Sequence, residues 1–403
     1  MRSCARSRGR VRIVIVSVFT DMGGMQMSRY VVVGGGIVGA SAAYHLAQAG
    51  VETVLVDRAD KGQATAAGAG IISPGPSRHD TSAFYTLATP AVTYYPQLVQ
   101  TLAEIGQKNT GYEVVGELYL AENEAEAVEL ESVHARVLER RAQGVPNIGE
   151  LSWIDQRQAR TLFPAVGHVE RAIHISGAAR VDGALMRDAL HVGARYHGAV
   201  LRHGAAELLL ESGRVGGVRV DGESIEADGV VLACGAWTNG LLAQLGYGLP
   251  VAPQRGQILH ITMGETDTSR WPILAWFGDQ YILAFGPNRV VAGATRETGS
   301  GFDVRQTPGG VRHVLDTALR IAPGLAEGTL HEIRVGLRPF SDDGVPFLGT
   351  MPGFDNVVIA TGHGPSGLTL GPYSGLVAAN LLLGQPVELN LDLFAVERGL
   401  API

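Results

Sequence analysis

Apolar residues near the start of the chain form two short runs separated by a stretch with helical periodicity. Tyr30–Val33 is apolar throughout and predicts a buried strand. Ile37–Gly50 follows as a helix that ends at a glycine, and Val51–Val56 is a second apolar run that closes at Asp57. The pattern predicts one β-α-β unit, the start of a doubly wound parallel sheet.

The rest of the chain alternates helical and strand-like patterns. Residues 85–170 differ in character, with a charged helix at Glu122–Arg141 whose expected inner positions are Val128, Leu130, Val133 and Leu138. Asp182 precedes an apolar helical repeat and is expected to cap a helix within Gly177–Leu190, which Val192–Tyr196 would prolong. Further strands are expected at Gly116–Ala121, Trp153–Asp155, Ala206–Glu211, Arg214–Val220, Ser224–Ala227, Gly229–Ala233, Ile258–Met263, Gln280–Phe285, Val290–Ala294, Glu332–Leu337 and Val357–Ala360, and further helices at Asn239–Gly246, Gly310–Ile321 and Ser374–Leu383.

These elements predict an α/β protein in which two domains are interleaved. Residues 28–85, 172–250 and 335–403 are expected to form a Rossmann-type dinucleotide-binding domain. Residues 86–171 and 251–334 are expected to form an α+β substrate domain on a mainly antiparallel sheet. Residues 1–27 contain five arginines and then an apolar run, as a signal peptide does, but no clear cleavage site. We interpret them as an extension that is disordered or not native.

Composition excludes several classes of function. The net charge of −7 gives no basis for binding nucleic acid. With only Cys4 and Cys234 and no CxxC motif, neither a disulfide framework nor a metal site is expected. No apolar run reaches the roughly 18 residues that a membrane-spanning helix needs. We therefore expect a cytoplasmic protein, with attachment to the inner face of a membrane and homo-oligomerisation as open alternatives.

The first strand-to-helix turn carries a dinucleotide fingerprint. Gly34, Gly36 and Gly39 follow the GxGxxG spacing, in which the glycines permit a tight turn, close approach of a pyrophosphate, and packing of helix on strand. The amides at the helix start would bind phosphate. Asp57 lies 23 positions after Gly34 and would accept hydrogen bonds from ribose hydroxyls. This unit alone does not distinguish NAD from FAD.

A second glycine-rich turn lies near the end of the chain. The segment GLRPFSDDGVPFLG contains Arg338 at the end of a strand, and the sequence TGHGPSGLT around His363 joins the next strand to a helix. A second turn of this kind indicates that a flavin ring is held as well, with a charged substrate group beside it. An arginine offers two parallel donors to a carboxylate. An ion pair with Asp342 or Asp343 is the structural alternative for Arg338.

From Ser28 to its C-terminus the chain resembles the D-amino-acid oxidase superfamily of FAD-dependent oxidoreductases, which includes glycine oxidases, sarcosine oxidases and bacterial D-amino-acid dehydrogenases. The resemblance rests on blocks in the same order: VVVGGGIVGASAAYHLAQAG with VLVDRA, ATAAGAGIISPG, RVDGALMRDAL, VVLACGAWTN, PQRGQIL, YILAFGPNRVVAGAT and the two closing segments. It implies FAD as the cofactor. Sarcosine oxidases attach FAD through a cysteine in the C-terminal half, whereas Cys234 is the last cysteine here, so the resemblance implies non-covalent FAD.

The resemblance also implies roles for individual residues. Arg338 would hold the substrate carboxylate and Tyr281 would touch the substrate, although Tyr281 could equally be a core aromatic. His363 would tune the flavin or steer oxygen, or else serve only as a hydrogen-bonding support. The adenine would be held by main-chain groups at Glu207 or the residue beside it, and Trp237 would lie near the pyrophosphate or only pack. The implied cofactor-binding set is Gly34, Gly36, Ile37, Val38, Gly39, Asp57, Arg58, Thr65, Ala66, Gly68, Ala69, Gly70, Glu207, Gly235, Trp237, Arg338, Gly362, Gly364, Pro365, Ser366, Gly367 and Leu368.

The implied reaction is oxidation of a C–N bond in a small amino acid or secondary amine, of the glycine, sarcosine or D-amino-acid type. Hydride would pass to the flavin, and the resulting imine would be hydrolysed to a 2-oxo acid. Dioxygen, a quinone or an electron carrier would accept the electrons. Three alternatives stay open: a dehydrogenase that delivers to a partner, a flavin subunit of a larger amine dehydrogenase, and a 2-hydroxy-acid oxidase.

Overall fold

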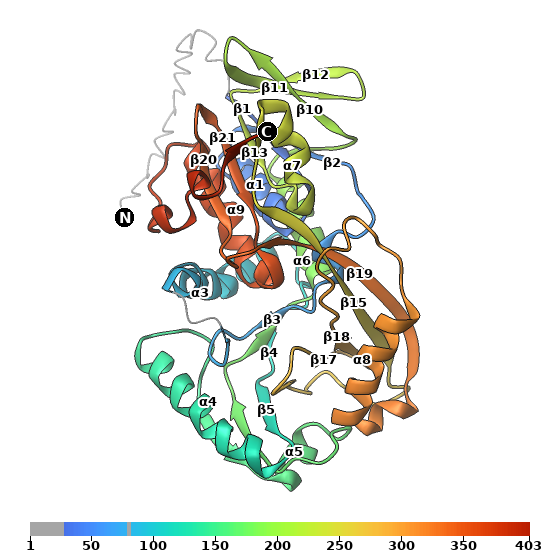
Figure 1. The fold of residues 1–403 in the computed structure, drawn as a ribbon. Helices are drawn as coiled ribbons and strands as arrows, with labels where there is room; N and C mark the ends of the chain where they lie inside the picture. The colour runs from blue at the N-terminus through green and yellow to red at the C-terminus, as the bar shows by residue number, and fades with distance from the viewer. Residues whose placement is uncertain (1–27, 79–81) are drawn as a thin grey trace, which may run out of the picture.

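A six-stranded sheet organises the upper half of the molecule in Figure 1. The structure is a computed structural model and describes residues 28–78 and 82–403. The central strand pairs in parallel with a neighbour on each side, in the order β20-β21-β13-β1-β2-β9. The strands are β1 (Arg29–Val33), β2 (Glu52–Asp57), β9 (Val200–His203), β13 (Gly229–Leu232), β20 (Phe347–Met351) and β21 (Phe354–Thr361). The predicted β-α-β unit is confirmed, because α1 (Ile37–Gln48) joins β1 to β2.

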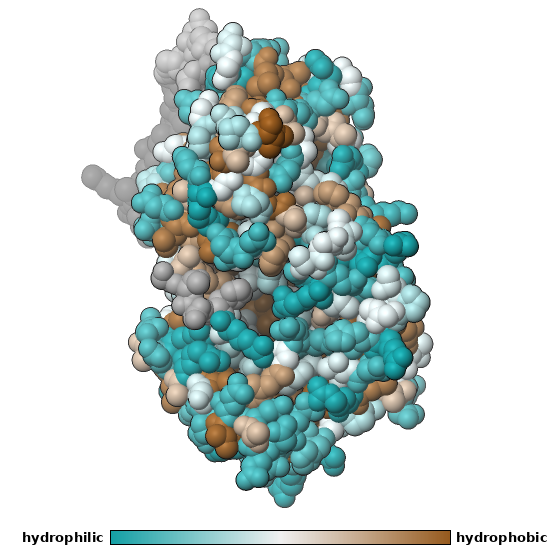
Figure 2. Space-filling model, viewed as in Figure 1, coloured by the Kyte–Doolittle hydropathy of each residue, from teal (hydrophilic) through white to brown (hydrophobic). Residues whose placement is uncertain are grey.

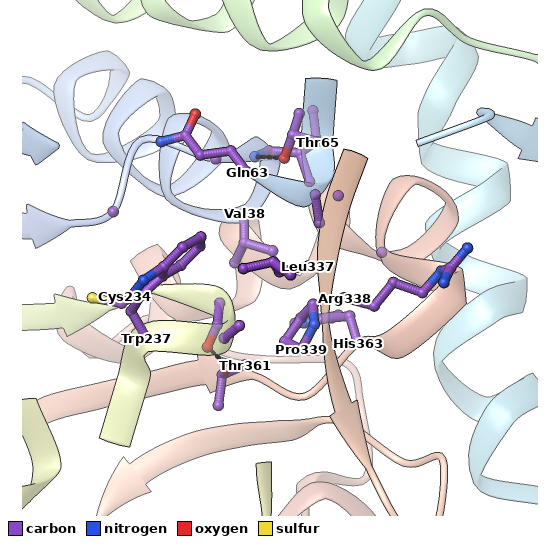
Figure 3. Close-up of a pocket in the computed structure, with 18 of the residues that line it drawn as sticks. Val38, Gln63, Thr65, Cys234, Trp237, Leu337, Arg338, Pro339, Thr361 and His363 are labelled. Carbon is purple, nitrogen blue, oxygen red and sulfur yellow. Dashed lines mark hydrogen bonds between the residues drawn. The ribbon is translucent and has the colours of Figure 1, made fainter. Parts of the chain in front are cut away.

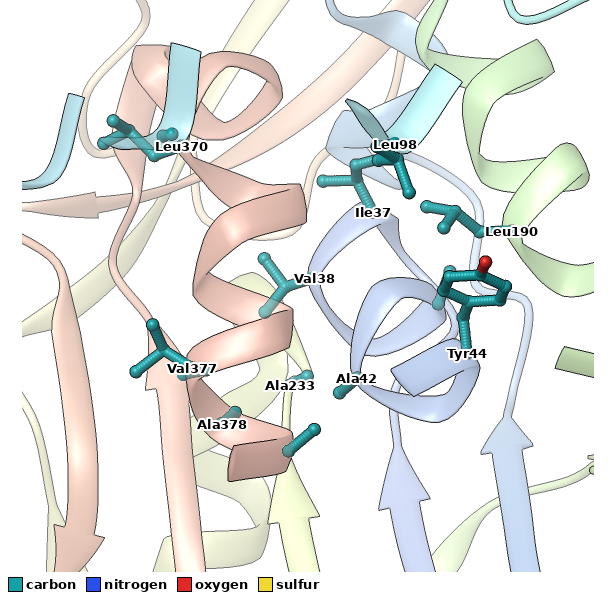
Figure 4. Packing of buried hydrophobic residues seen from close by; sticks show 14 of the residues in the cluster. Ile37, Val38, Ala42, Tyr44, Leu98, Leu190, Ala233, Leu370, Val377 and Ala378 are labelled. Carbon is teal, nitrogen blue, oxygen red and sulfur yellow. The ribbon is translucent and has the colours of Figure 1, made fainter. Parts of the chain in front are cut away.

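Helices cover one face of this sheet and a small antiparallel sheet covers the other. The helical layer contains α1, α3 (Ser82–Glu104), α6 (Gly183–Tyr196) and α9 (Gly367–Leu382), which share one buried apolar cluster. Helices α1 and α9 pack closely (Figure 4), since a Cβ at Gly375 would lie 2.4 Å from the Val38 carbonyl oxygen. The small sheet consists of β10 (Ala206–Glu211), β11 (Arg214–Val220) and β12 (Glu223–Glu226).

The lower half of the molecule is built on an eight-stranded sheet of order β19-β15-β18-β17-β16-β5-β7-β6. Its pairs are antiparallel except β16 with β5. The strands are β5 (Glu117–Ala121), β6 (Leu151–Ile154), β7 (Arg171–Ile175), β15 (Val251–Thr262), β16 (Ile273–Trp276), β17 (Tyr281–Phe285), β18 (Arg289–Gly293) and β19 (Thr329–Ser341). The helices of this half are α4 (Glu124–Ala142), α5 (Gln156–Leu162) and α8 (Pro308–Ile321).

The long strands β15 and β19 connect the two halves. They pair from Val251 with Ser341 to Thr262 with Thr329, and in Figure 1 they run from the six-stranded sheet into the lower half. Shorter elements lie around this junction. They are α2 (Ala64–Ala67), α7 (Thr238–Leu242), β3 (Ile71–Ile72), β4 (Glu113–Val114), β8 (Ala179–Arg180), β14 (Tyr247–Gly248) and β22 (Ala401–Pro402). The chain therefore has the α/β fold that was predicted, with one mainly parallel sheet, whose edge strand β20 is antiparallel, and one mainly antiparallel sheet.

Several details differ from the expectations. On α4, the expected inner positions Leu130 and Val133 are buried, but Val128 is exposed. Val137, which was not expected to be buried, continues the buried face of the helix. Helix α9 begins at Gly367 rather than at Ser374. Most of helix α3 falls within the expected substrate domain 86–171, but the helix packs beside α1 and α9. The domain boundaries stay a prediction, and the interpretation of residues 1–27 lies outside the described residues.

On the face drawn in Figure 2, hydrophilic side chains predominate and apolar ones are scattered between them. This face shows no large apolar patch that would indicate a protein partner. Among the described residues, none of the helices has the length and apolar character to cross a membrane. A homo-oligomer stays a prediction.

Candidate flavin and substrate site

A cavity of about 550 Å³ lies where the two halves meet. It opens at the carboxyl ends of β1, β2, β13 and β21, the edge at which parallel sheets bind ligands. It continues under β15, β17 and β19, and Figure 3 shows Val38, Thr65, Trp237, Arg338 and His363 around it. The cavity thus joins the dinucleotide turn to the substrate half.

In the first turn, Gly34 and Gly39 lie so close to neighbouring backbone that a side chain would clash. Gly34 has φ +104°, and a Cβ there would lie 2.3 Å from the Ala233 carbonyl oxygen. A Cβ at Gly39 would lie 1.8 Å from the Gly34 carbonyl oxygen, so Gly39 permits packing and does not itself line the cavity. Gly34, Gly36, Ile37 and Val38 do line it.

The carboxylate at the end of β2 is held in place at the cavity wall. The Gln63 side-chain amide donates to Asp57 at 3.0 and 3.1 Å, and the Ala59 amide donates to it at 2.9 Å. Arg58 also lines the cavity but pairs with Asp60 at 2.8 Å, which offsets much of its charge. Asp57 therefore lines the cavity at the end of β2, and its contact with a ribose stays a prediction.

The small-residue segment around α2 forms another wall. Thr65, Gly68, Ala69 and Gly70 line the cavity, and the Thr65 hydroxyl accepts from the Ile37 amide at 3.0 Å. Ala66 does not line the cavity. Its carbonyl accepts from Arg334 at 3.0 Å, because this peptide faces β19.

The turn after β13 presents open backbone and a shielded thiol. Gly235 has φ +54°, and a Cβ there would meet no atom within 4 Å. Cys234 lines the cavity, where its thiol donates to the Val33 carbonyl at 3.2 Å. Burial raises the pKa of the Cys234 thiol to about 12, so it stays protonated. Trp237 lines the cavity and packs on Phe302, with ring centroids 5.5 Å apart.

Glu207 lies away from the cavity. Its side chain is exposed and pairs with Arg219 at 3.7 Å on the small antiparallel sheet. The preceding residues, Gly204, Ala205 and Ala206, line the cavity instead. Ala206 is thus the residue beside Glu207 that lines the cavity, and the main-chain contact to an adenine stays a prediction.

The second glycine turn lines the opposite wall. His363, Gly364, Pro365, Gly367 and Leu368 contribute to the cavity, whereas Gly362 and Ser366 do not. Gly364 has φ +50°, and a Cβ there would meet no atom within 4 Å.

The imidazole of His363 is buried and bonded within the fold. Its Nε2 lies 2.9 Å from the Ser374 hydroxyl, which donates to the Leu370 carbonyl at 3.1 Å and so accepts from the ring. Burial lowers the pKa of His363 to about 4, so the ring is neutral at neutral pH. This geometry favours the hydrogen-bonding support over a charged role.

Arg338 lies at the substrate end of the cavity, on β19. Its Nη1 donates to the Thr295 carbonyl at 3.1 Å. In the strand register Arg338 is opposite Gln254, but its guanidinium lies over Gly256, where a Cβ would be 2.5 Å from both Nη1 and Nη2. Glycine at 256 therefore makes room for the guanidinium.

No carboxylate among residues 28–78 and 82–403 lies within 4.0 Å of the Arg338 guanidinium. Asp343, one of the two alternatives, pairs instead with Arg398 at 3.3 Å. Tyr281 lines the cavity beside Arg338, and burial raises its pKa while the guanidinium opposes that rise. The Arg338 guanidinium therefore has no carboxylate partner among the described residues and could bind the carboxylate of a substrate.

Sequence reasoning missed Gln63, Asp279, Arg296 and Phe302, all of which line the cavity. Gln63 could have been found from its place just before the ATAAGAG segment. Asp279, Arg296 and Phe302 lie in loops without periodicity, so no local signal marked them. Within the described part of the chain, no cluster of side chains suited to a metal ion is found.

The residues present fit a flavin dinucleotide. Two wall glycines, Gly235 and Gly364, leave open backbone, and the α1 N-terminus supplies amides for a pyrophosphate. One cavity therefore joins a dinucleotide-type turn to a guanidinium that has no carboxylate partner among the described residues.

Comparison with known proteins identifies the family. Residues 29–381 match the family model described as FAD dependent oxidoreductase. An uncharacterised oxidoreductase of Bacillus subtilis, YurR, is 41% identical over 91% of this chain and 98% of its own length. Glycine oxidase of Pseudomonas aeruginosa is 31% identical over 89% of this chain and 95% of its own length. The crystal structure of iminodiacetate oxidase from Chelativorans sp. BNC1 has a TM-score of 0.87 at 40% identity, covering 91% of this chain and 98% of that one.

The chain belongs to this family of FAD-dependent oxidoreductases, which confirms the predicted resemblance and FAD as the cofactor. The roles of the individual site residues stay predictions.

Proposed function

We propose that the protein oxidises the C–N bond of a small amino acid or secondary amine that carries a carboxylate. The observation that carries the proposal is the Arg338 guanidinium, which faces the cavity without an acidic partner in the described chain. The names of two similar proteins, glycine oxidase and iminodiacetate oxidase, support an amine carboxylate as the substrate class.

FAD, when bound along the glycine turns, supplies the acceptor for a hydride from the carbon beside nitrogen. The protein's own contribution is orientation. Arg338 would hold the carboxylate through two N–H donors, and the Tyr281 hydroxyl beside it would complete the contact. With the carboxylate held at Arg338, the rest of the substrate would lie in the same cavity that Gly364 and Leu368 line.

The remaining steps need little from the protein. The amine is taken up neutral, and its N–H proton passes to water as the imine forms. Water then hydrolyses the imine to a 2-oxo acid and ammonia or a primary amine. His363 would support the loop and stay neutral, since its pKa is lowered to about 4 by burial. Dioxygen or an electron carrier would take the electrons onward.

The experiment is loss of flavin absorbance without oxygen, with glycine, sarcosine, D-alanine, D-proline and glycolate tested separately. We expect at least one amine carboxylate to bleach the flavin, and a matched amine without a carboxylate, dimethylamine, to bleach it far more slowly. Bleaching by glycolate alone would assign the protein to 2-hydroxy acids and contradict the proposal. Readmission of air then separates an oxidase, which consumes oxygen steadily, from a dehydrogenase.

A further inference from the structure

A second arginine faces the substrate end of the cavity. Arg296 lies in the loop after β18 and lines the same cavity as Arg338. Its side chain also finds no carboxylate within 4.0 Å among the described residues. By contrast, the nearby Arg255 pairs with both Glu297 and Asp303, at 2.5 and 2.6 Å.

The two arginines, neither of which pairs with a carboxylate of the described residues, lie close to each other. Arg338 donates to the carbonyl of Thr295, and Arg296 is the next residue along the chain. The charge of Arg296 is close enough to contribute to lowering the pKa of Arg338, although burial is the larger cause. Two cations therefore converge on one end of the cavity.

The loop that carries Arg296 is held firmly. The Gln257 side-chain amide donates to Glu297 at 2.7 Å and to Thr307 at 2.9 Å. Arg255 donates to Glu297 at 2.9 Å through Nε. On the other side of Arg296, the Gln257 backbone amide donates to the Thr295 hydroxyl at 2.9 Å. These bonds hold the backbone on both sides of Arg296 in place.

The other charge at this end of the cavity does not neutralise the pair. Of the acidic residues that line the cavity, Asp57 and Asp60 lie at or just after the end of β2, and Asp279 lies 3.6 Å from Arg78. Like charges that converge without an anion oppose each other. A single carboxylate would occupy one guanidinium fork and leave the second unfilled.

We propose that the substrate is an amine flanked by two carboxylates, with Arg338 holding the carboxylate next to the oxidised carbon and Arg296 holding the other. The inference rests on the proposed oxidation of an amine. Loss of hydride to FAD and of the N–H proton to water gives an imine, and water cleaves it to a 2-oxo acid and an amine that keeps the second carboxylate. Arg296 then determines specificity.

Binding tests the role of Arg296 without any turnover. Diglycolate has two carboxylates around an ether oxygen, and methoxyacetate has one, and neither has a C–N bond. Dissociation constants of both are measured by calorimetry on the FAD-loaded enzyme. We expect the wild type to bind diglycolate at least about 10-fold more tightly, because a second charge-assisted contact is made.

Arg296→Gln should remove most of that preference and change methoxyacetate binding less than about 3-fold. Arg305→Gln is the matched control, because Arg305 is an exposed arginine of the same loop that does not line the cavity. It should keep the preference. No preference in the wild type, or an unchanged preference in Arg296→Gln, would overturn the inference.

A kinetic experiment distinguishes two outcomes: that Arg296 does not bind a second carboxylate, and that the protein does not oxidise amines at all. Iminodiacetate and sarcosine are compared as anaerobic reductants of the flavin. Arg296→Gln should slow reduction by iminodiacetate about 10- to 100-fold and reduction by sarcosine less than about 3-fold. Equal effects on both would refute the role of Arg296 while the amine function stands. If no amine reduces the flavin, the proposed function fails, and binding alone decides whether two carboxylates are recognised.

Discussion

At the scale of single residues, the substrate end depends on one guanidinium and the glycine that makes room for it. Arg338 could be predicted from the Gly-Leu-Arg-Pro segment and the family resemblance. The reason that Gly256 is glycine could not be predicted, because the two residues come together only through strand pairing between β15 and β19.

Gly256→Ala should therefore impair catalysis although no charged group is removed. The new Cβ would lie 2.5 Å from both terminal nitrogens of Arg338, so the flexible side chain must move out of place. We expect kcat/KM to fall about 10- to 100-fold with FAD content unchanged.

Gly349→Ala is the control, because it is also a buried strand glycine and its Cβ would meet nothing nearer than 3.9 Å. Activity of Gly256→Ala equal to that of this control would show that the position of Arg338 does not matter.

At the scale of elements, the glycine turn before α1 brings the helix onto the sheet and opens the cofactor site. The β-α-β unit was predictable because its signals are local: an apolar run, three spaced glycines and a terminal carboxylate. Helix α3 was not predicted, since Pro90 and Pro96 lie inside it and obscure its periodicity. The loop with Arg296 was not predictable either, because long-range bonds to Arg255 and Gln257 determine its course.

Gly39→Val and Gly36→Val should each abolish flavin content. At Gly39 the side chain would collide with the Gly34 carbonyl and separate α1 from the turn. At Gly36 it would occupy space that the pyrophosphate needs. The measurement is the ratio of flavin to protein absorbance after purification. Gly309→Val, in α8 where a Cβ meets nothing within 4 Å, should stay fully loaded.

At the scale of the whole molecule, the protein should hold FAD without a covalent bond. The Cys234 thiol is protonated, bonded to Val33 and placed at the dinucleotide turn. Acid precipitation should therefore leave the yellow colour in the supernatant. A yellow pellet would show that another side chain attaches the flavin.

Stability should decline in mild acid. Burial lowers the pKa values of His45, His260 and His363 to about 4, so between pH 4 and 6.5 the folded state binds fewer protons than the unfolded state. The free energy of unfolding then falls as pH drops, by roughly 1.4 kcal/mol per pH unit for each such group. Glu117 opposes this, because burial raises its pKa to about 7.

Urea midpoints at pH 5, 6, 7 and 8 check this expectation. Glu117→Gln should gain stability above pH 7, since it removes a buried carboxylate that must ionise there, and should steepen the decline in acid. Midpoints that rise on acidification would contradict the account.

The central claim is that Arg338 captures a substrate carboxylate, and kcat/KM of Arg338→Ala with two reductants tests it most directly. A bidentate arginine–carboxylate contact should be worth roughly 2–4 kcal/mol, which is a loss of about 30- to 1000-fold for an amine carboxylate. Arg338→Lys should recover only part, because an ammonium lacks the fork. Slow turnover of a simple primary amine without a carboxylate should barely change. Equal losses for the two reductants would mean that Arg338 is structural, and the assignment to amine carboxylates would fail.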